Sequence, residues 1–308
     1  MSIEILENWD LKQYTTFKTG GKAKKVYIPD NITSFTSLLA ELKNPIIIGG
    51  GSNILISSKG VEQDVIITKK LDKIEFNGNI VSAQCGVKGP FLSQTCQKQG
   101  LSGFEFMIGF PGTIGGMVCM NASAHNQAIQ DSLKSCMVFD PISQKIIELT
   151  KDDLKFGYRK SIIPQNNYIV IGAQFELKIS DKEKINELIQ RNLEFRKQKQ
   201  PSLSIPNAGS TFKNPQNDSA GRLLDLAGVK GLTVGGAKVW ENHANFIVNF
   251  DNADSKDILN LMYKMYNIVK EKYTIELRPE IKYIGIKEAE EKELWQTMTG
   301  ENTAKIQK

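Results

Sequence analysis

The chain has 308 residues, of which 40% are apolar and 24% are charged, so it can form two or three subdomains with buried cores. These fractions exclude a disordered chain and a fibrous one. The net charge of +5 comes from intermixed Lys and Glu, a balance that suits anionic small molecules at least as well as nucleic acid. No basic run is interleaved with aromatic residues, which argues against a nucleic-acid binder.

The location of the protein is predicted from its N-terminus and its cysteines. The first ten residues are acidic and lack the apolar region of a signal peptide, and no window reaches the ~18 apolar residues of a membrane span. The four cysteines, Cys85, Cys96, Cys119 and Cys136, form no CxxC pair, which argues against a zinc site. We therefore expect free thiols in a reducing cytoplasm, and no metal.

Short β-rich runs and helices follow one another along the first 200 residues. We expect helices at residues 32–43, 89–100 and 181–200, where apolar residues recur at helical spacing. The expected strands are at residues 22–28, 45–48, 54–56, 65–67, 74–76, 80–81, 136–139, 145–149 and 168–177. Pro201 and Pro206 break the third helix, so a domain boundary is expected there.

The last third of the chain has its own pattern. Helices are expected at residues 219–227 and 254–273, the second capped by Asp254, with a β-like segment at 237–249 between them. A strand at 275–285 is interrupted by Pro279, and the tail beyond Lys287 is expected to end in an appended helix.

Two glycine-rich stretches indicate a bound nucleotide cofactor. Residues 49–53 (GGGSN) lie between two short apolar strands, and residues 109–121 hold four glycines in one turn-prone segment. The pattern GxxxxGK[ST] is absent, and GxGxxG fails because Ile54 occupies the third glycine position. A tight hairpin would explain the first stretch alone, whereas two such stretches favour a large flat or phosphorylated ligand close to bare backbone.

Three side chains are candidates for the chemistry of such a site. Ser210 follows Ala-Gly in IPNAGSTFKNP, but neither of the two histidines has a GxSxG context, so the serine suits proton donation to a carbanion better than nucleophilic attack. Arg159 fits a plain surface turn or a bidentate contact with a carboxylate or phosphate. Glu280 fits an exposed strand position, or an inward carboxyl that donates a proton or orients another group.

Seven sequence blocks occur in an order that is specific to one protein family. They are YTTFKTGG at 14–21, IGGGSNILI at 48–56, GFPGTIGGMVCMNA at 109–122, GYRKS at 157–161, IPNAGSTFKNP at 205–215, HANFIVN at 243–249 and LRPEIKYIG at 277–285. Over residues 10–286 the chain resembles the UDP-N-acetylenolpyruvoylglucosamine reductases, flavoenzymes of bacterial cell-wall synthesis. The short gap between Arg159 and Lys199 resembles the subclass that lacks an extra tyrosine-bearing loop.

The resemblance implies an α+β fold, with an FAD-binding domain of the vanillyl-alcohol-oxidase type and a smaller α+β substrate-binding domain. The FAD-binding domain is expected at residues 1–199, in two subdomains of about 1–70 and 71–199, and the substrate-binding domain at 200–274. Residues 275–308 would return as a strand to the first domain and end in a tail. Glu280 and Arg159 would then belong to one domain and Ser210 to the other, so that closure over substrate completes the site.

The implied reaction is an NADPH-dependent, FAD-mediated reduction of the enolpyruvyl group of UDP-N-acetylglucosamine enolpyruvate to UDP-N-acetylmuramate, by a cytoplasmic monomer. Ser210 corresponds to the family's proton donor, and Arg159 and Glu280 to its other two catalytic residues. The matching FAD-binding residues are Gly49, Gly50, Gly51, Ser52, Asn53, Pro111, Gly112, Thr113, Ile114, Gly115, Gly116, Asn121 and Ala122. The matching substrate-binding residues are Tyr158, Lys199, Lys213, Asn214 and Asn245.

The chain departs from the family pattern in two places. A small residue followed by Tyr-Gly is usual after Ala122, where this chain has Ser123, Ala124, His125 and Asn126, and Trp240 stands where a serine is common. No motif histidine or cysteine other than His125 is a candidate for flavin attachment, so we expect non-covalent FAD. A flavin oxidase of the same fold and a nucleotide-binding module without turnover remain alternatives at this point.

Overall fold

The computed structural model of the protein describes residues 3–300, which divide into two compact units. The first contains residues 3–7, 25–50 and 63–196, and the second contains residues 8–24, 51–62 and 197–300. No helix among the described residues combines the length and the apolar character that crossing a bilayer requires.

A small, largely parallel sheet contributes to the first unit. Its strand order is β1 (Ile3–Asp10), β2 (Lys22–Pro29), β5 (Val65–Ile67) and β3 (Ile46–Ile48), and β5 is parallel to both β2 and β3. The helix α1 (Ile32–Glu41) follows β2 and begins where the Asn31 side chain accepts a hydrogen bond from the Ser34 N–H. The all-apolar β5 is buried throughout, as expected of a strand in a covered parallel sheet.

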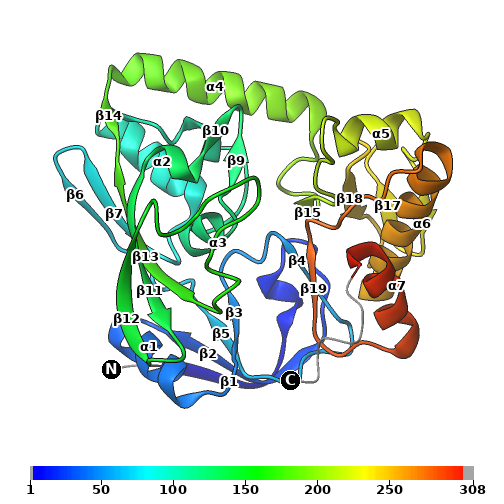
Figure 1. Cartoon of the computed structure of the whole chain (residues 1–308), viewed down its shortest axis with the longest axis horizontal. Coiled ribbons are helices and arrows are strands. Elements are labelled where there is room, and N and C mark those ends of the chain that lie inside the picture. Colours follow the sequence, from blue (N-terminus) through cyan, green and yellow to red (C-terminus); the bar gives the residue numbers. More distant parts are fainter. Residues whose placement is uncertain (1–2, 301–308) are drawn as a thin grey trace. The chain divides into compact units, whose positions relative to one another are not determined.

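A five-stranded antiparallel sheet forms the larger part of the first unit. Its order is β12 (Lys145–Thr150), β11 (Leu133–Asp140), β13 (Ile169–Glu176), β7 (Ile80–Gln84) and β6 (Ile74–Asn77). In β7, Val81 and Ala83 are buried and alternate with the half-buried Ile80, Ser82 and Gln84, so one face of the strand meets the core. The helix α3 (Ile114–Cys119) packs on β13 and β7 (Figure 1).

Shorter elements complete the first unit. They are α2 (Gly89–Lys98), β8 (Leu101–Ser102) with its partner β14 (Lys178–Ile179), the hairpin of β9 (Ser123–Ala124) and β10 (Gln127–Ala128), the 3-10 helices η2 (Glu105–Met107) and η3 (Ile129–Asp131), and α4 (Lys182–Lys199), whose last three residues fall in the second unit.

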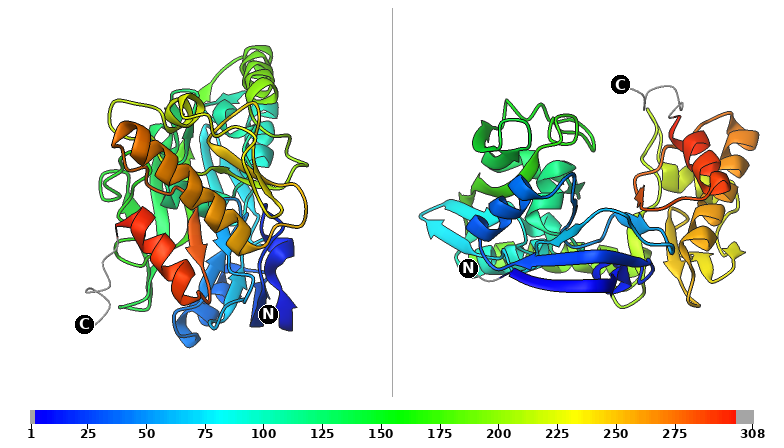
Figure 2. Two further views of the ribbon diagram at one scale, coloured as in Figure 1. Left: turned by 90° about the vertical axis from the view of Figure 1, so that its right-hand side faces the viewer. Right: turned by 90° about the horizontal axis from the view of Figure 1, so that it is seen from below.

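The second unit is built on an antiparallel sheet of order β15 (Asn207–Ser210), β18 (Phe246–Asn249), β17 (Ala237–Val239) and β16 (Thr233–Val234). Its helices are η1 (Leu11–Tyr14), α5 (Ala220–Leu226), α6 (Ser255–Tyr273) and α7 (Ala289–Thr299), and α6 and α7 lie side by side (Figure 2). A capping box between Asp254 and Asp257 starts α6. In the same unit, β4 (Ile54–Ile56) pairs in parallel with β19 (Lys282–Ile284).

Most of the predicted elements are confirmed, and three are corrected. Residues 114–119 form α3 inside the stretch that we interpreted as a turn-prone loop. The segment 237–249 is two strands separated by a loop, and only residues 282–284 of the predicted strand 275–285 are a strand. The proline accounts for the last difference, because Pro279 lacks an N–H and makes only an isolated bridge, to Phe212.

The division into units also differs from the domain boundaries that we predicted. The segment after residue 274 belongs to the same unit as residues 200–274, and so do residues 8–24 and 51–62. Glu280 therefore shares a unit with Ser210, whereas we expected it to share a domain with Arg159. The assignment of FAD and substrate to these parts of the chain stays a prediction.

Candidate functional site

The two glycine stretches meet in the first unit, although sixty residues separate them. A Cβ atom added to Gly50 would lie 3.0 Å from the Gly112 Cα, and one added to Gly49 would overlap the Thr113 hydroxyl oxygen. Side chains at these positions would therefore push the two loops apart. Glycine is explained at position 50 by the close approach of the Gly112 backbone, and at position 49 by the approach of the Thr113 side chain.

The second stretch is held by the backbone that follows β7. Gly115 N–H donates to the Cys85 carbonyl at 2.9 Å, and Gly89 N–H donates to the Gly112 carbonyl at 3.0 Å. The Thr113 hydroxyl is buried and has no hydrogen-bond partner among residues 3–300, while a Cβ at Gly116 would meet nothing within 4 Å. A buried polar atom without a partner, beside open glycine backbone, suits a bound polar ligand. These residues fit the cofactor that the sequence predicts.

The remaining residues of the first stretch, Gly51, Ser52 and Asn53, belong to the second unit. Gly51 has a φ of +61°, and a Cβ there would overlap the Tyr14 carbonyl oxygen. The Gly51 carbonyl accepts hydrogen bonds from the Thr16 N–H at 3.1 Å and from its hydroxyl at 3.4 Å. The YTTFKTGG block therefore holds Gly51 in place by hydrogen bonds and close packing, a structural role that the sequence did not indicate.

Ser210 and Glu280 lie on neighbouring backbone segments. Residues 278–280 run beside residues 211–213: Glu280 N–H donates to the Thr211 carbonyl, and Lys213 N–H to the Arg278 carbonyl, both at 2.9 Å. Asn53 Nδ2 donates to the Glu280 carbonyl at 3.2 Å, and the Asn53 carbonyl accepts from Lys282 N–H at 3.0 Å. The second unit thus brings together Ser210, Glu280 and Asn53.

Asn245 anchors the segment that follows Ser210. Its Oδ1 accepts from the Phe212 N–H at 2.9 Å and its Nδ2 donates to the Phe212 carbonyl at 2.8 Å, while its own carbonyl accepts from Thr211 N–H. The residue is only 3% exposed. These bonds assign Asn245 to holding the backbone, and its predicted contact with substrate stays a prediction.

The Ser210 hydroxyl is half-buried and has no hydrogen-bond partner within the described part of the chain. His243 is in the same unit, but its Nδ1 accepts from the Asn245 N–H at 3.2 Å, and no hydrogen bond joins it to Ser210 within residues 3–300. Burial, and secondarily Lys230, lower the pKa of His243. This geometry gives no support to a histidine-activated nucleophile.

Arg159 lies at the tip of a tight turn in the first unit. Gly157 and Lys160 exchange both of their backbone hydrogen bonds, at 3.1 Å, and Arg159 between them has a φ of +53°. Asn121 Nδ2 donates to the Gly157 carbonyl at 3.1 Å, and the Ser161 hydroxyl donates to the Cys119 carbonyl at 2.7 Å. The turn is thereby tied to the last residue of α3, Cys119, and to Asn121 just beyond the helix.

The Arg159 guanidinium makes its own contacts. Its Nη1 donates to the Ser123 hydroxyl oxygen at 2.8 Å, and its Cζ lies 5.4 Å from the centroid of the Tyr158 ring. Ser123 is one of the residues that depart from the family pattern, and no local sequence signal indicates that it contacts the arginine. The departing His125 packs edge-to-face on Phe195.

The other predicted substrate-binding residues differ in their surroundings. Tyr158 is 55% exposed, and Lys213 is half-buried. Lys199 is exposed at the last position of α4. The Asn214 side chain accepts from the Ala220 N–H at 3.1 Å, at the start of α5. The indole N–H of the departing Trp240 is buried and has no hydrogen-bond partner among residues 3–300.

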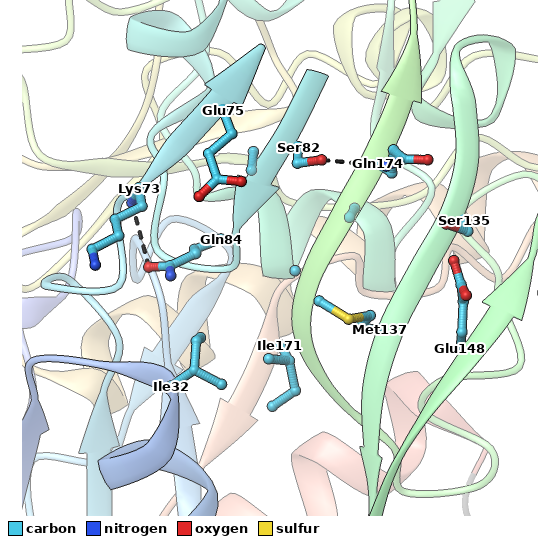
Figure 3. A pocket seen from close by; sticks show the side chains of 13 residues that line it. Ile32, Lys73, Glu75, Ser82, Gln84, Ser135, Met137, Glu148, Ile171 and Gln174 are labelled. Atoms are coloured by element: carbon cyan, nitrogen blue, oxygen red, sulfur yellow. Dashed lines mark hydrogen bonds between the residues drawn. The ribbon is translucent and has the colours of Figure 1, made fainter. Parts of the chain in front are cut away.

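A hollow in the first unit lies apart from these residues. It is on the five-stranded sheet, and its lining includes Ser82, Gln174 and Met137, with the charged side chains of Lys73, Glu75 and Glu148 around it (Figure 3). None of the residues that the sequence predicted for the site lines it. No cluster of three or more His, Cys, Asp or Glu side chains within residues 3–300 is arranged to hold a metal ion.

Comparisons with known proteins agree on one family. The family model "FAD binding domain" matches residues 25–147, and the model "UDP-N-acetylenolpyruvoylglucosamine reductase, C-terminal domain" matches residues 200–284. The predicted fold class, an α+β chain with an FAD-binding domain, is confirmed.

Relatives match over nearly the whole chain. The UDP-N-acetylenolpyruvoylglucosamine reductase of Caldicellulosiruptor bescii is 40% identical, over 92% of this chain and 91% of its own length. That of Prochlorococcus marinus is 41% identical, over 92% and 98%. The crystal structure of the reductase from Thermus caldophilus superimposes with a TM-score of 0.79 at 33% identity, over 92% of this chain and 99% of that one. The chain therefore belongs to the UDP-N-acetylenolpyruvoylglucosamine reductase family.

Proposed function

We propose that the chain reduces the enolpyruvyl group of UDP-N-acetylglucosamine enolpyruvate to UDP-N-acetylmuramate, with FAD as resident cofactor and NADPH as reductant. The observation that carries the proposal is the pairing of residues 278–280 with residues 211–213, which brings Glu280 next to the strand that ends at Ser210. Family membership supplies the reaction, and this pairing supports the assignment of two of its three catalytic residues.

The glycine loops are the proposed FAD site. Gly116 offers open backbone, Gly49 and Gly50 let the two loops approach each other, and the buried Thr113 hydroxyl offers a hydrogen bond that no residue among 3–300 takes up. These residues would hold FAD, and the bound flavin would supply hydride transfer from NADPH to the β-carbon of the enolpyruvyl ether. We expect the cofactor to be held without a covalent bond, so that acid denaturation leaves all yellow colour in the supernatant.

Ser210 is the proposed proton donor. Hydride addition at the β-carbon leaves negative charge at the α-carbon and its carboxylate, and such a carbanion is basic enough to take a proton from an alcohol. The hydroxyl of Ser210 is available for this step because no described residue bonds it, and its backbone is fixed by β18 and Asn245.

Glu280 and Arg159 are proposed to stabilise the charge that develops on the substrate. Charged and protonated groups that are aligned in advance lower the energy of such a transition state without reorganising. Glu280 is supported by its place beside residues 211–213, and Arg159 by its match to the family's arginine. The cationic Lys199 and Lys213, with Tyr158, Asn214 and Asn245 as neutral partners, suit a diphosphate-bearing sugar nucleotide.

Ser210→Ala tests the proposal, with Ser204→Ala in an exposed loop as the matched control. The rate at which NADPH reduces bound FAD, measured from the loss of flavin absorbance in a stopped-flow instrument, should be unchanged. This half-reaction requires no proton donor at the substrate α-carbon. Reduction of the enolpyruvyl substrate should fall about 10²–10⁴-fold. Equal losses in the two half-reactions would instead make Ser210 a structural residue.

We further propose that the protein acts as a cytoplasmic monomer and binds no nucleic acid. The absence of a disulfide among its four cysteines supports a reducing compartment.

The rival function is that of a flavin oxidase of the same fold. Rapid oxygen consumption with a simple alcohol, without NADPH, would favour it over the proposed reductase.

A further inference from the structure

We infer that Ser123 is a positioning residue for Arg159, and that it sets the direction of the guanidinium in this chain. The inference rests on the proposed function, in which Arg159 stabilises the negative charge of the substrate, and it places the guanidinium at the substrate carboxylate. Its basis is the 2.8 Å hydrogen bond from Arg159 Nη1 to the Ser123 hydroxyl, made where the chain departs from the family pattern.

The backbone contacts of the turn do not fix the guanidinium. Gly157, Asn121 and Ser161 hold the main chain of the turn, but the charged group lies several rotatable bonds beyond the Arg159 Cα. Tyr158 contacts the guanidinium across its ring, yet it is 55% exposed and is carried on the same turn. A fixed direction therefore requires a contact from another element.

Ser123 provides that contact from a paired strand. It opens the β9–β10 hairpin, where Ser123 is registered with Ala128 and Ala124 with Gln127. The hairpin turn has the two left-handed residues, His125 and Asn126, that match the twist of a two-residue loop. The hydroxyl thus projects from a hairpin that has its own cross-strand pairing, and the residues just before it, Cys119 and Asn121, are bonded to the arginine turn.

The hydroxyl, rather than the main chain of residue 123, makes the better bond. The Ser123 carbonyl is 3.4 Å from Arg159 Nη1, against 2.8 Å for the hydroxyl oxygen, and any residue at this position would supply the carbonyl. Because serine is neutral, its contact orients the guanidinium without cancelling its charge. An acidic residue at position 123 would compete with the substrate carboxylate for the arginine.

Ser123→Ala and Ser123→Thr, each as the FAD-loaded full chain, test the inference. Titration calorimetry with UDP-N-acetylmuramate should show about tenfold weaker binding for Ser123→Ala, because a hydrogen bond to a charged group is lost. KM should rise by a similar factor, the thermal unfolding midpoint should not move, and Ser123→Thr, which keeps the hydroxyl on a strand, should restore binding. Ser143→Ala, in the exposed β11–β12 turn, is the control for removal of a hydroxyl.

The double variant Ser123→Ala/Arg159→Ala separates this inference from the proposed function. If Ser123 acts through Arg159, adding Ser123→Ala to Arg159→Ala should weaken product binding no further. Additive losses, or wild-type binding by Ser123→Ala while Arg159→Ala is crippled, would overturn the positioning of Arg159 by Ser123. If Arg159→Ala itself binds product as the wild type does, the proposed function of Arg159 fails, and the inference fails with it.

Discussion

The two regions that carry the proposed catalytic side chains are held in different ways. In the second unit, Ser210 and Glu280 lie on backbone segments that are joined by main-chain hydrogen bonds, as in a sheet. In the first unit, Arg159 stands on a turn with a left-handed backbone and is fastened by the side chains of Asn121, Ser161 and Ser123. In one region two separate main-chain segments pair with each other, whereas the other is a single tight turn that three side chains fasten to its neighbours.

This difference matches the two kinds of chemistry that we propose. A proton donor must meet one atom within hydrogen-bond reach, and short side chains on paired strands leave few rotatable bonds to fix. The guanidinium of an arginine that binds a carboxylate lies further from its backbone than a serine hydroxyl does, so neighbouring side chains must orient it. We call the paired segments 207–213 and 278–280 the strand-held region. We expect its stability to depend little on side chains that do not bond these segments. The stability of the turn at 157–160 should fall when a single supporting side chain is removed.

Of the variants predicted here, Glu280→Gln should have the largest effect, and this effect should be on the rate of substrate reduction. It tests whether the main chain alone positions the second-unit segments. Gln keeps the backbone N–H and carbonyl that bond Thr211 and Asn53 and matches glutamate in size, so the protein should still fold. Loss of the carboxyl should slow reduction of the enolpyruvyl substrate about 10²–10³-fold. Single-turnover kinetics and urea denaturation measure the two quantities. A large loss of stability with little loss of rate would place Glu280 in the scaffold.

Asn245→Ala should show that even the strand-held region depends on one side chain. The variant leaves the Phe212 N–H and carbonyl buried without their partner, and each such group costs about 1–3 kcal/mol. We expect the free energy of unfolding to fall by about 3 kcal/mol in urea denaturation. Asn267→Ala, on the half-buried face of α6, is the control and should show no loss. A loss below ~1 kcal/mol would mean that strand pairing alone holds the segment after Ser210.

Asn121 gives the corresponding test in the turn region. Asn121→Ala removes the bonds to Gly157 and Gln130 and also forces alanine into a left-handed backbone, with a φ of +45°. We expect it to cost about 2–3 kcal/mol of unfolding free energy, of which ~1 kcal/mol is the backbone penalty. Asn121→Gly, free of that penalty, should recover the difference. Equal losses for the two variants would show that the amide bonds alone matter.

The sequence predicted the elements with strong local signals. The helix α6 has a capping box at Asp254 and a continuous apolar face, and it was predicted to within a residue. The helix α3 was missed because Gly115 and Gly116 read as a turn, whereas its first turn is held from outside by the carbonyls of Val87 and Cys85. Contacts between distant segments have no local signature, so the sequence did not show this support.

The same limit applies to the site. The candidate residues could be named because motif order is a property of the sequence. Their partners could not: the pairing of Glu280 with Thr211 crosses about seventy residues and rests on two main-chain bonds and an isolated bridge at Pro279. Likewise, the bond between Arg159 and Ser123 depends on where a hairpin and a turn meet in space.

His243 should make the stability of the second unit depend on pH, and this is the smallest of the expected effects. Burial is the main cause that lowers its pKa, Lys230 and Lys199 add to this effect, and Asp225 opposes it. The folded protein therefore takes up a proton on His243 less readily than the unfolded chain does. The contribution of this group to stability is complete above its ordinary pKa of about 6.5 and is lost as the pH falls below that value.

Urea denaturation at pH 7.5, 6.5 and 5.5 should show this loss in the wild type and a weaker one in His243→Asn. Asparagine is the matched replacement, because its Oδ1 can accept the Asn245 N–H, as the histidine Nδ1 does, but does not titrate. His125→Asn is the comparison variant, because the pKa of His125, on a hairpin in the other unit, is also lowered, by burial and by Arg191. Since His125 is exposed and His243 is half-buried, His125→Asn should weaken the slope less than His243→Asn does. If His243→Asn retains the slope of the wild type, the pH dependence does not arise from His243.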